Sequence, residues 1–287
     1  LPGGKNCRPG SPIWETWSDY ICRLYARVQK RLRKVTERGV PGVLHTDIRS
    51  EPMLSTRWSI YGPNSGLYSS FQDPERSFDG LDVISATGWQ KHGDNLCFEP
   101  LFWGDLFGRP AQRVKAALWT PGFGAGTTRY TEVLKHVGMN LARGTVPAYL
   151  GLNTYGILPF TNTGHRWNRV DYGFREELKL AFDFVQCFGE LATRAERRGP
   201  VAVLASWHQG VNESGRSFRN GADLWELIGG LYMANYPATF VYESDVEAGA
   251  LTDFKVLFIT GQTVPLPEPV SQQLAAFVKA GGVIIAS

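Results

Sequence analysis

Cysteine is scarce in this 287-residue sequence. The four cysteines, Cys7, Cys22, Cys97 and Cys187, lie far apart, and no two of them are spaced as CxxC. The spacing that zinc and redox sites use is therefore missing, although an even number leaves a disulfide open. The glycine patterns GxGxxG and GxxxxGK[ST], which bind dinucleotides and phosphates, are missing too. We expect no metal site and no cofactor.

Long apolar runs and a strong excess of one charge are also missing. No apolar stretch approaches the roughly 18 residues that a bilayer-spanning helix needs. The formal net charge is only +3, which gives no support to binding of nucleic acid or of an anionic membrane. The content of 43% hydrophobic and 20% charged residues is ordinary for a globular protein. The length allows two domains.

Aromatic residues, by contrast, are plentiful. They make up 13% of the chain and include nine tryptophans. Indole rings stack on the apolar faces of sugars, and they also fill large cores. The composition is therefore compatible with a carbohydrate site without requiring one.

Short apolar runs alternate with helical patterns along the last 89 residues, from Gly199 to Ser287. Strands this apolar do not face water, so the alternation indicates a parallel sheet with both faces covered. We predict a doubly wound domain over residues 199–287. Its predicted strands are 201–205, 239–242, 255–259 and 283–285, and its helices lie around 224–232 and over 268–280.

Four strand-then-helix units precede this domain. Their predicted strands are 43–48, 81–86, 114–119 and 146–150, and two long helices are predicted over 12–38 and 174–197. Four such units over residues 1–198 predict half of a βα barrel, because a complete barrel takes roughly 250 residues. An open flavodoxin-like sheet throughout fits the alternation equally well. Because the chain starts without Met and stops directly after an apolar strand, we expect a fragment of a larger protein.

The tail resembles the flavodoxin-like, amidotransferase-like domain of family 42 β-galactosidases. The similarity lies in the succession YPATFVY at 236–242, Asp245, FKVLFI at 254–259 and FVKAGG at 277–282. Segments 98–107, 114–119 and 136–144 resemble the second half of that family's barrel. The resemblance implies a glycoside hydrolase acting on terminal sugars such as β-galactosides. It also implies a homo-oligomer, a trimer in that family's case, that assembles through the tail domain.

Active sites of βα barrels lie at the carboxyl ends of the strands. By that rule we propose three carboxylates as catalytic candidates, Asp47, Glu51 and Glu99, because glycoside hydrolysis uses a pair of them. The candidates for sugar binding are Trp89, Trp119, Asn153, Tyr155 and His165.

One feature departs from the family pattern. The resemblance places a nucleophilic glutamate near Trp119–Pro121, but no Asp or Glu stands there, and Thr120 cannot take its role. A non-catalytic sugar-binding or structural homologue is therefore the second hypothesis, and an unrelated small-molecule-binding α/β protein is the third. Amide hydrolysis by the tail is not expected, because it needs a cysteine nucleophile and none follows Cys187.

Overall fold

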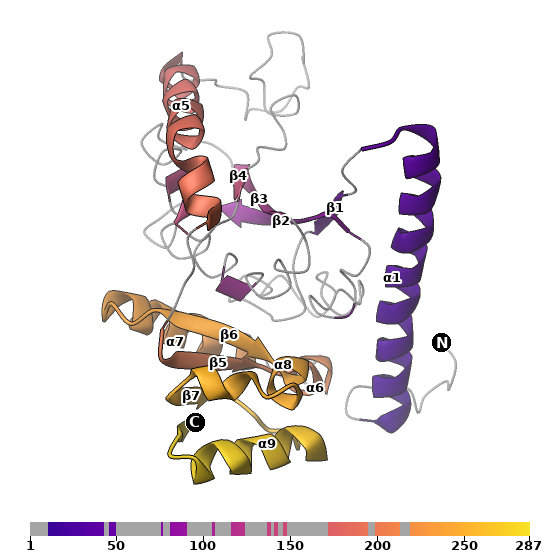
Figure 1. Ribbon diagram of the computed structural model, residues 1–287, viewed down its shortest axis with the longest axis vertical. Helices are drawn as coiled ribbons and strands as arrows, with labels where there is room; N and C mark the ends of the chain where they lie inside the picture. The colour runs from indigo at the N-terminus through magenta and orange to yellow at the C-terminus, as the bar shows by residue number, and fades with distance from the viewer. Residues whose placement is uncertain are drawn as a thin grey trace. The chain divides into compact units, whose positions relative to one another are not determined.

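A computed structural model gives the fold of the chain (Figure 1). It describes residues 11–42, 46–49, 76, 81–90, 105–106, 116–123, 137–138, 141–142, 146–147, 172–194, 199–212 and 219–287.

The chain divides into two compact units, each described by itself. Unit 1 comprises Leu1–His45, Glu51–Leu81 and Arg197–Ser287, and unit 2 comprises Thr46–Ser50 and Asp82–Glu196. The predicted domain boundary between residues 198 and 199 stays a prediction.

Helix α1 (Pro12–Gly39) confirms the first predicted helix. Ser11 caps its start, because the Ser11 hydroxyl oxygen accepts a hydrogen bond from the Trp14 amide at 3.2 Å. Proline in the first turn fits the same end, where its missing N–H would have no helical partner. The helix ends before Gly42, whose φ of 82° lies in the left-handed region that favours glycine.

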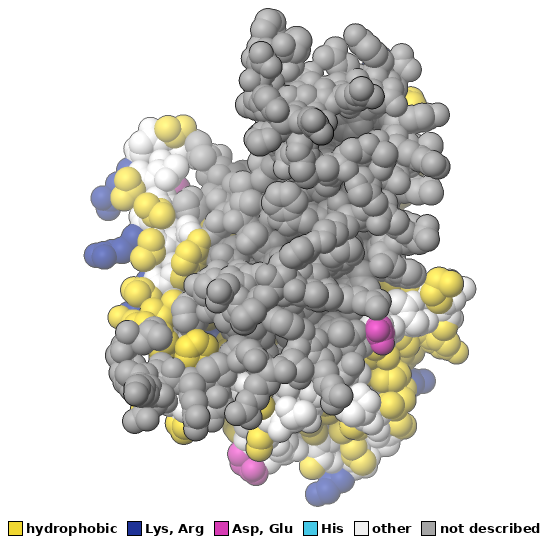
Figure 2. All heavy atoms as spheres, turned by 180° about the vertical axis from the view of Figure 1, so that it is seen from behind, with side chains coloured by type: hydrophobic (Ala, Val, Ile, Leu, Met, Phe, Trp, Pro, Cys, Tyr) yellow, Lys and Arg dark blue, Asp and Glu magenta, His cyan; other side chains and the backbone are white. Residues whose placement is uncertain are grey.

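The face that α1 buries is not the expected apolar stripe. Its buried residues are Ser18, Cys22, Ala26 and Gln29. Leu24, Val28 and Leu32, which the periodicity assigned to the core, are instead 37%, 44% and 49% exposed. Hydrophobic and basic side chains therefore lie side by side on the surface of α1 (Figure 2). Small side chains allow the closer approach of a neighbouring element, which explains why that face is the one that packs.

Unit 2 contains a four-stranded parallel sheet, here called sheet A. Its strands are β1 (Thr46–Arg49), β2 (Val83–Gln90), β3 (Ala116–Phe123) and β4 (Val146–Pro147). They lie in chain order, and every pair of neighbours is parallel. The long helix α5 (Tyr172–Arg194) follows them. This confirms the prediction of successive parallel strands.

Two strands of sheet A run further than predicted. Thr87–Trp89, expected after the end of the second strand, lies within β2, and Pro121–Phe123, expected to be a loop, lies within β3. The two extensions pair with each other, with Gly88 opposite Pro121 and Gln90 opposite Phe123. An apolar run marks the buried part of a strand, whereas backbone pairing with a long neighbour carries the strand beyond that part.

The second parallel sheet, here called sheet B, belongs to unit 1. Its strands β5 (Val201–Ala205), β6 (Ala238–Tyr242), β7 (Val256–Ile259) and β8 (Val283–Ala286) lie in the order β6-β5-β7-β8. The elements between them are α6 (Trp207–Asn212), α7 (Arg219–Met233), α8 (Glu243–Glu247), the 3-10 helix η4 (Ala250–Asp253) and α9 (Glu268–Lys279). The four predicted strands and two predicted helices of the tail are all present.

Strand β5 is the centre of sheet B and is buried along its whole length. Alternate residues of a strand point to opposite faces, so both faces of the sheet are covered. One face packs on α8, η4 and α9 through a cluster whose buried members are Ala202, Leu204, Val241, Val246, Leu251, Leu257, Ile259, Val270 and Phe277. These residues give sheet B its hydrophobic core, and the polar residues at the strand ends are held on that rigid base.

Candidate functional site

Three predicted site residues lie in the strands of sheet A. Asp47 is in β1 opposite Ile84, and Trp89 is near the end of β2 opposite Gly122. Trp119 is in the middle of β3, opposite Ala86 on one side and Pro147 on the other. The carboxyl ends of parallel strands meet at one edge of a sheet, and Trp89 lies close to that edge.

The other five predicted site residues are Glu51, Glu99, Asn153, Tyr155 and His165. They lie outside the described residues, and their roles stay predictions.

The true end of β3 bears on the missing nucleophile. β3 ends at Phe123 rather than at Trp119, so the strand-end position moves four residues along the chain. The longer strand does not bring in an acid, because the sequence contains no Asp or Glu from Leu106 to Thr131. The departure from the family pattern therefore holds for the strand as the structure gives it.

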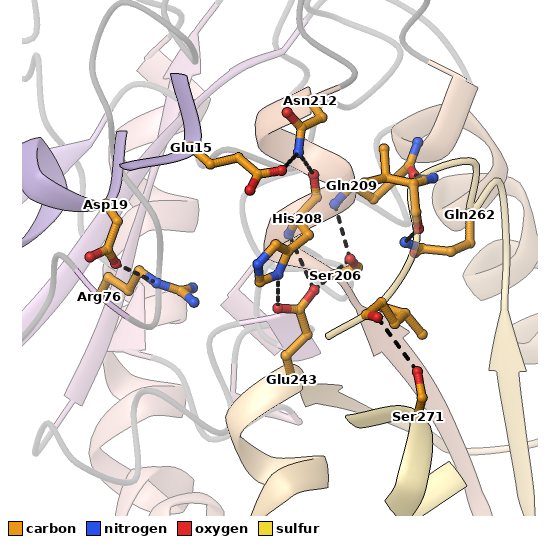
Figure 3. A network of polar contacts seen from close by, with 12 residues as sticks. Glu15, Asp19, Arg76, Ser206, His208, Gln209, Asn212, Glu243, Gln262 and Ser271 are labelled. Carbon is orange, nitrogen blue, oxygen red and sulfur yellow. Dashed lines mark hydrogen bonds and ion pairs between the residues drawn. The ribbon is translucent and has the colours of Figure 1, made fainter. Parts of the chain in front are cut away.

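A cluster of polar side chains lies at the carboxyl end of sheet B (Figure 3). Glu243, the first residue of α8, follows β6 directly and is 2% exposed. Its Oε1 accepts a hydrogen bond from the Ser206 hydroxyl at 2.6 Å and from the His208 amide at 3.2 Å. Its Oε2 lies 2.5 Å from Nδ1 of His208. One buried carboxylate thus joins the segment after β5 to the segment after β6.

The electrostatics of this cluster favour an ion pair. Burial by itself raises the pKa of Glu243, but the hydrogen bonds from His208 and Ser206 and the charge of His208 outweigh burial and hold the pKa below its ordinary value. For His208, burial lowers the pKa, but the hydrogen bond to Glu243 and the charges of Glu243 and Glu15 outweigh it and raise the pKa. An ionised carboxylate only accepts hydrogen bonds, so Nδ1 of His208 carries the hydrogen.

The connections of Ser206 decide what this cluster can do chemically. A serine nucleophile needs its hydroxyl on a general base. The Ser206 hydroxyl instead donates to Glu243 and accepts the Gln209 amide at 3.0 Å. That second bond caps α6, a short helix where the sequence predicted a loop. Ser206 is therefore engaged in holding backbone and is not arranged for covalent catalysis.

Gln209 closes the same edge on the other side of β5. Its side chain is fully buried, and its Oε1 accepts the amides of Thr263 and Val264 at 2.8 and 2.9 Å. Its Nε2 donates to the Thr263 hydroxyl at 3.0 Å. Open α/β sheets bind ligands where the strand order reverses, which here is between β5 and β7. In this chain a glutamine of the protein itself occupies that position.

Helix α1 is held on α6 by two hydrogen bonds. Trp14 Nε1 donates to the Val211 carbonyl at 2.9 Å, and Asn212 Nδ2 donates to Glu15 Oε1 at 2.5 Å. The side chains of Cys22, Trp207 and Val211 pack together beneath Trp14.

Arg76 adds a further link between α1 and α6. Its Nε lies 3.1 Å from Asp19 Oδ1, and its guanidinium stacks on the Trp207 ring, with Cζ 4.0 Å from the ring centroid. Arg76 therefore ties α1 to the residue that starts α6.

Within the described ranges, no group of three His, Cys, Asp or Glu side chains is placed to hold a metal ion. The helices of the described part of the chain include none that is long and apolar enough to cross a bilayer.

The sequence reasoning missed Ser206, Gln209 and Glu243. A usable signal was present, because Ser206 and Glu243 are the first polar residues after the apolar strands β5 and β6. We applied the strand-end rule to the first four strands only. The bond between Gln209 and a loop 54 residues further along the chain has no local sequence signal.

No protein-family model matches the chain, and no curated protein matches it. Solved structures do match. A β-galactosidase from Bacillus circulans sp. alkalophilus has a TM-score of 0.61 at 16% identity, covering 91% of this chain and 38% of that one. A β-galactosidase from the psychrophilic Marinomonas ef1 has a TM-score of 0.56 at 12% identity, covering 91% and 42%. The α-L-fucosidase isoenzyme 2 from Paenibacillus thiaminolyticus has a TM-score of 0.56 at 14% identity, covering 92% and 35%.

These matches show that the chain has a glycoside-hydrolase-like α/β fold of parallel sheets. The resemblance to β-galactosidases that the sequence predicts is confirmed at the level of the fold. The chain spans about two fifths of the length of the solved structures it matches.

Proposed function

We propose that this chain is part of a glycoside-hydrolase-like protein that acts on or binds terminal sugars such as β-galactosides. The observation that carries the proposal is the likeness of fold to two β-galactosidases and a fucosidase over at least 91% of the chain. Fold alone does not define function. The roles of single residues therefore rest on their positions in the strands.

In this proposal sheet A is the second half of a βα barrel. Its four strands follow one another in chain order and are all parallel, as consecutive barrel strands are. Trp89, Trp119, Asn153, Tyr155 and His165 would bind the sugar at the carboxyl edge of this sheet. Asp47, Glu51 and Glu99 are the candidate catalytic carboxylates.

Sheet B is, in the same proposal, the start of a flavodoxin-like, amidotransferase-like domain. Its strand order β6-β5-β7-β8 corresponds to the order 2-1-3-4 with which flavodoxin-like sheets begin. The sequence offers no cysteine after Cys187 for amide hydrolysis. We assign this domain a role in assembling a homo-oligomer, such as a trimer.

A non-catalytic sugar-binding homologue is the second candidate. One observation favours it, namely the lack of any acid from Leu106 to Thr131, on both sides of the end of β3. Retaining hydrolysis needs a second carboxylate about 5–5.5 Å from the first to act as nucleophile.

Assays of the intact protein separate the two candidates. We expect turnover of nitrophenyl glycosides if the protein is catalytic, with a loss of at least about 100-fold in kcat when the right carboxylate is changed, in D47N, E51Q or E99Q. We expect sugar binding without turnover if it is not. W89A and W119A should weaken sugar binding in both cases. A protein that neither cleaves nor binds any sugar would refute both.

A further inference from the structure

Unit 1 contains a joint whose state depends on pH and which the proposed sugar function does not use. We propose that Ser206, His208 and Glu243 form a pH-sensitive joint that positions α6, and that this joint thereby controls how firmly α1 is held on sheet B.

The first step is the position of the joint between the two strands. Glu243 follows β6 and receives three donors from the segment after β5: the Ser206 hydroxyl, the His208 amide and the His208 ring (Figure 3). All three come from the first turn of α6 or its cap. The direction in which α6 leaves β5 is therefore fixed by a single buried carboxylate.

The second step leads from α6 to α1. The two groups on α6 that hold α1 are the Val211 carbonyl and the Asn212 side chain. Asn212 Nδ2 also donates to the carbonyl of His208 at 2.9 Å. A change in the position of His208 therefore moves the residues on which α1 is seated.

The third step is the set of charges around the imidazole. Glu243 faces it from α8 and Glu15 from α1, and both favour the imidazolium. Arg76 opposes the imidazolium, but Arg76 is itself paired with Asp19 of α1. The His208 side chain is 24% exposed, so protons reach it from water without unfolding of the chain.

The joint is strongest when Glu243 is ionised and His208 is protonated, because the bond between them is then charge-assisted at both ends. Deprotonation of His208 removes one of the two charges. Since binding free energies are reciprocal, a charge that the docked arrangement stabilises also stabilises docking. Raising the pH above the titration of His208 should therefore loosen α1.

The thiol of Cys22 offers a direct measure of this loosening. Cys22 lies on α1, is fully buried and packs against Trp207 and Val211 of α6. In a C7S/C97S/C187S background, a thiol reagent labels only Cys22. Dividing its rate in the urea-unfolded protein by its rate in the native protein, at each pH, gives a protection factor from which thiol ionisation cancels.

We expect the protection factor to fall by about fivefold or more between pH 6 and pH 9, the lower end of typical coupling between sites. The fall should disappear in H208Q, whose amide still donates to Glu243 but does not titrate. It should persist in E268Q, a matched control on the exposed first residue of α9. Protection that does not change with pH, or an equal fall in H208Q, overturns the proposal.

A second measurement does not depend on a variant folding. Nitrogen NMR of the His208 ring in the folded protein gives its titration midpoint, which we expect above 6.5. The fall in Cys22 protection must share that midpoint. A clear difference between the two midpoints refutes the joint even if every substitution is silent.

Discussion

The side chain of Gln209 predicts how much of the stability of sheet B depends on one buried amide. It makes three hydrogen bonds to the loop after β7, at 2.8, 2.9 and 3.0 Å. Each such bond contributes about 0.5–1.5 kcal/mol net. Thr263 is exposed and Val264 half-buried, so water can reach the loop amides once Gln209 is gone. We therefore expect Q209M, which keeps the volume, to lose about 2 kcal/mol.

Comparison with Q209A separates hydrogen bonding from packing. Because Gln209 is 0% exposed, truncation leaves a cavity as well, and we expect about 1–2 kcal/mol more than for Q209M. Q272A is the matched control, since the exposed Gln272 only bonds Glu268 one turn away. Such a pair contributes less than about 0.5 kcal/mol.

Urea denaturation measures these free energies, and limited proteolysis at residues 260–267 reports on the loop itself. We expect faster cleavage of the loop in Q209M and Q209A and unchanged cleavage in Q272A. If Q209M unfolds within about 0.5 kcal/mol of the unchanged protein and its loop stays protected, the amide does not hold the loop and the reasoning fails.

Three further predictions concern unit 1. Stability should be highest between the ordinary pKa values of Glu243, 4.5, and His208, 6.5: the lowered pKa of Glu243 contributes stability that is lost as pH falls through its folded value, and the raised pKa of His208 contributes stability that is lost as pH rises through its own. Urea midpoints from pH 3 to 9 check this, and E243Q should flatten the profile. W14F removes the 2.9 Å bond to Val211 and should cost about 1 kcal/mol, measured by urea denaturation; no change would mean that water replaces the bond. G282A should destabilise, because a Cβ there meets the ring of the buried Phe277, whereas G229A in α7 meets nothing within 4 Å and should gain about 0.5–1 kcal/mol; melting temperatures that shift in the same direction would contradict this pair.

The elements of the fold were largely readable from the sequence. Strands 201–205 and 256–259 are short apolar runs with turn residues on both sides, and burial on both faces is what such runs indicate. The order of the strands within sheet B was not readable, because it depends on which strands pair across the whole domain. Periodicity also misjudged α1, whose Leu24, Val28 and Leu32 are exposed. An apolar stripe says that a face is suited to burial, not that a partner covers it.

The candidate site was readable only in part. The strand-end rule chose Asp47 and Trp89 from positions in the chain, and the structure places both in strands of sheet A. Contacts that join distant segments, such as Ser206 with Glu243 and Gln209 with Thr263, need the paired sheet before they exist. Polar residues just after buried strands can be named from sequence, whereas their partners cannot.

The two sheets therefore differ in what their carboxyl ends leave available for chemistry. At sheet B, Glu243 is surrounded by three donors, Ser206 caps α6, and Gln209 is bound to a loop. Groups saturated in this way stabilise the fold, and they have little capacity left to bind a substrate. Any sugar chemistry then has to come from residues of unit 2 and its flanking segments. We accordingly expect E243Q to lower stability while the activity per folded molecule stays unchanged, and D47N to do the opposite if Asp47 is catalytic. Loss of activity in folded E243Q would show that the sheet B cluster takes part in the reaction.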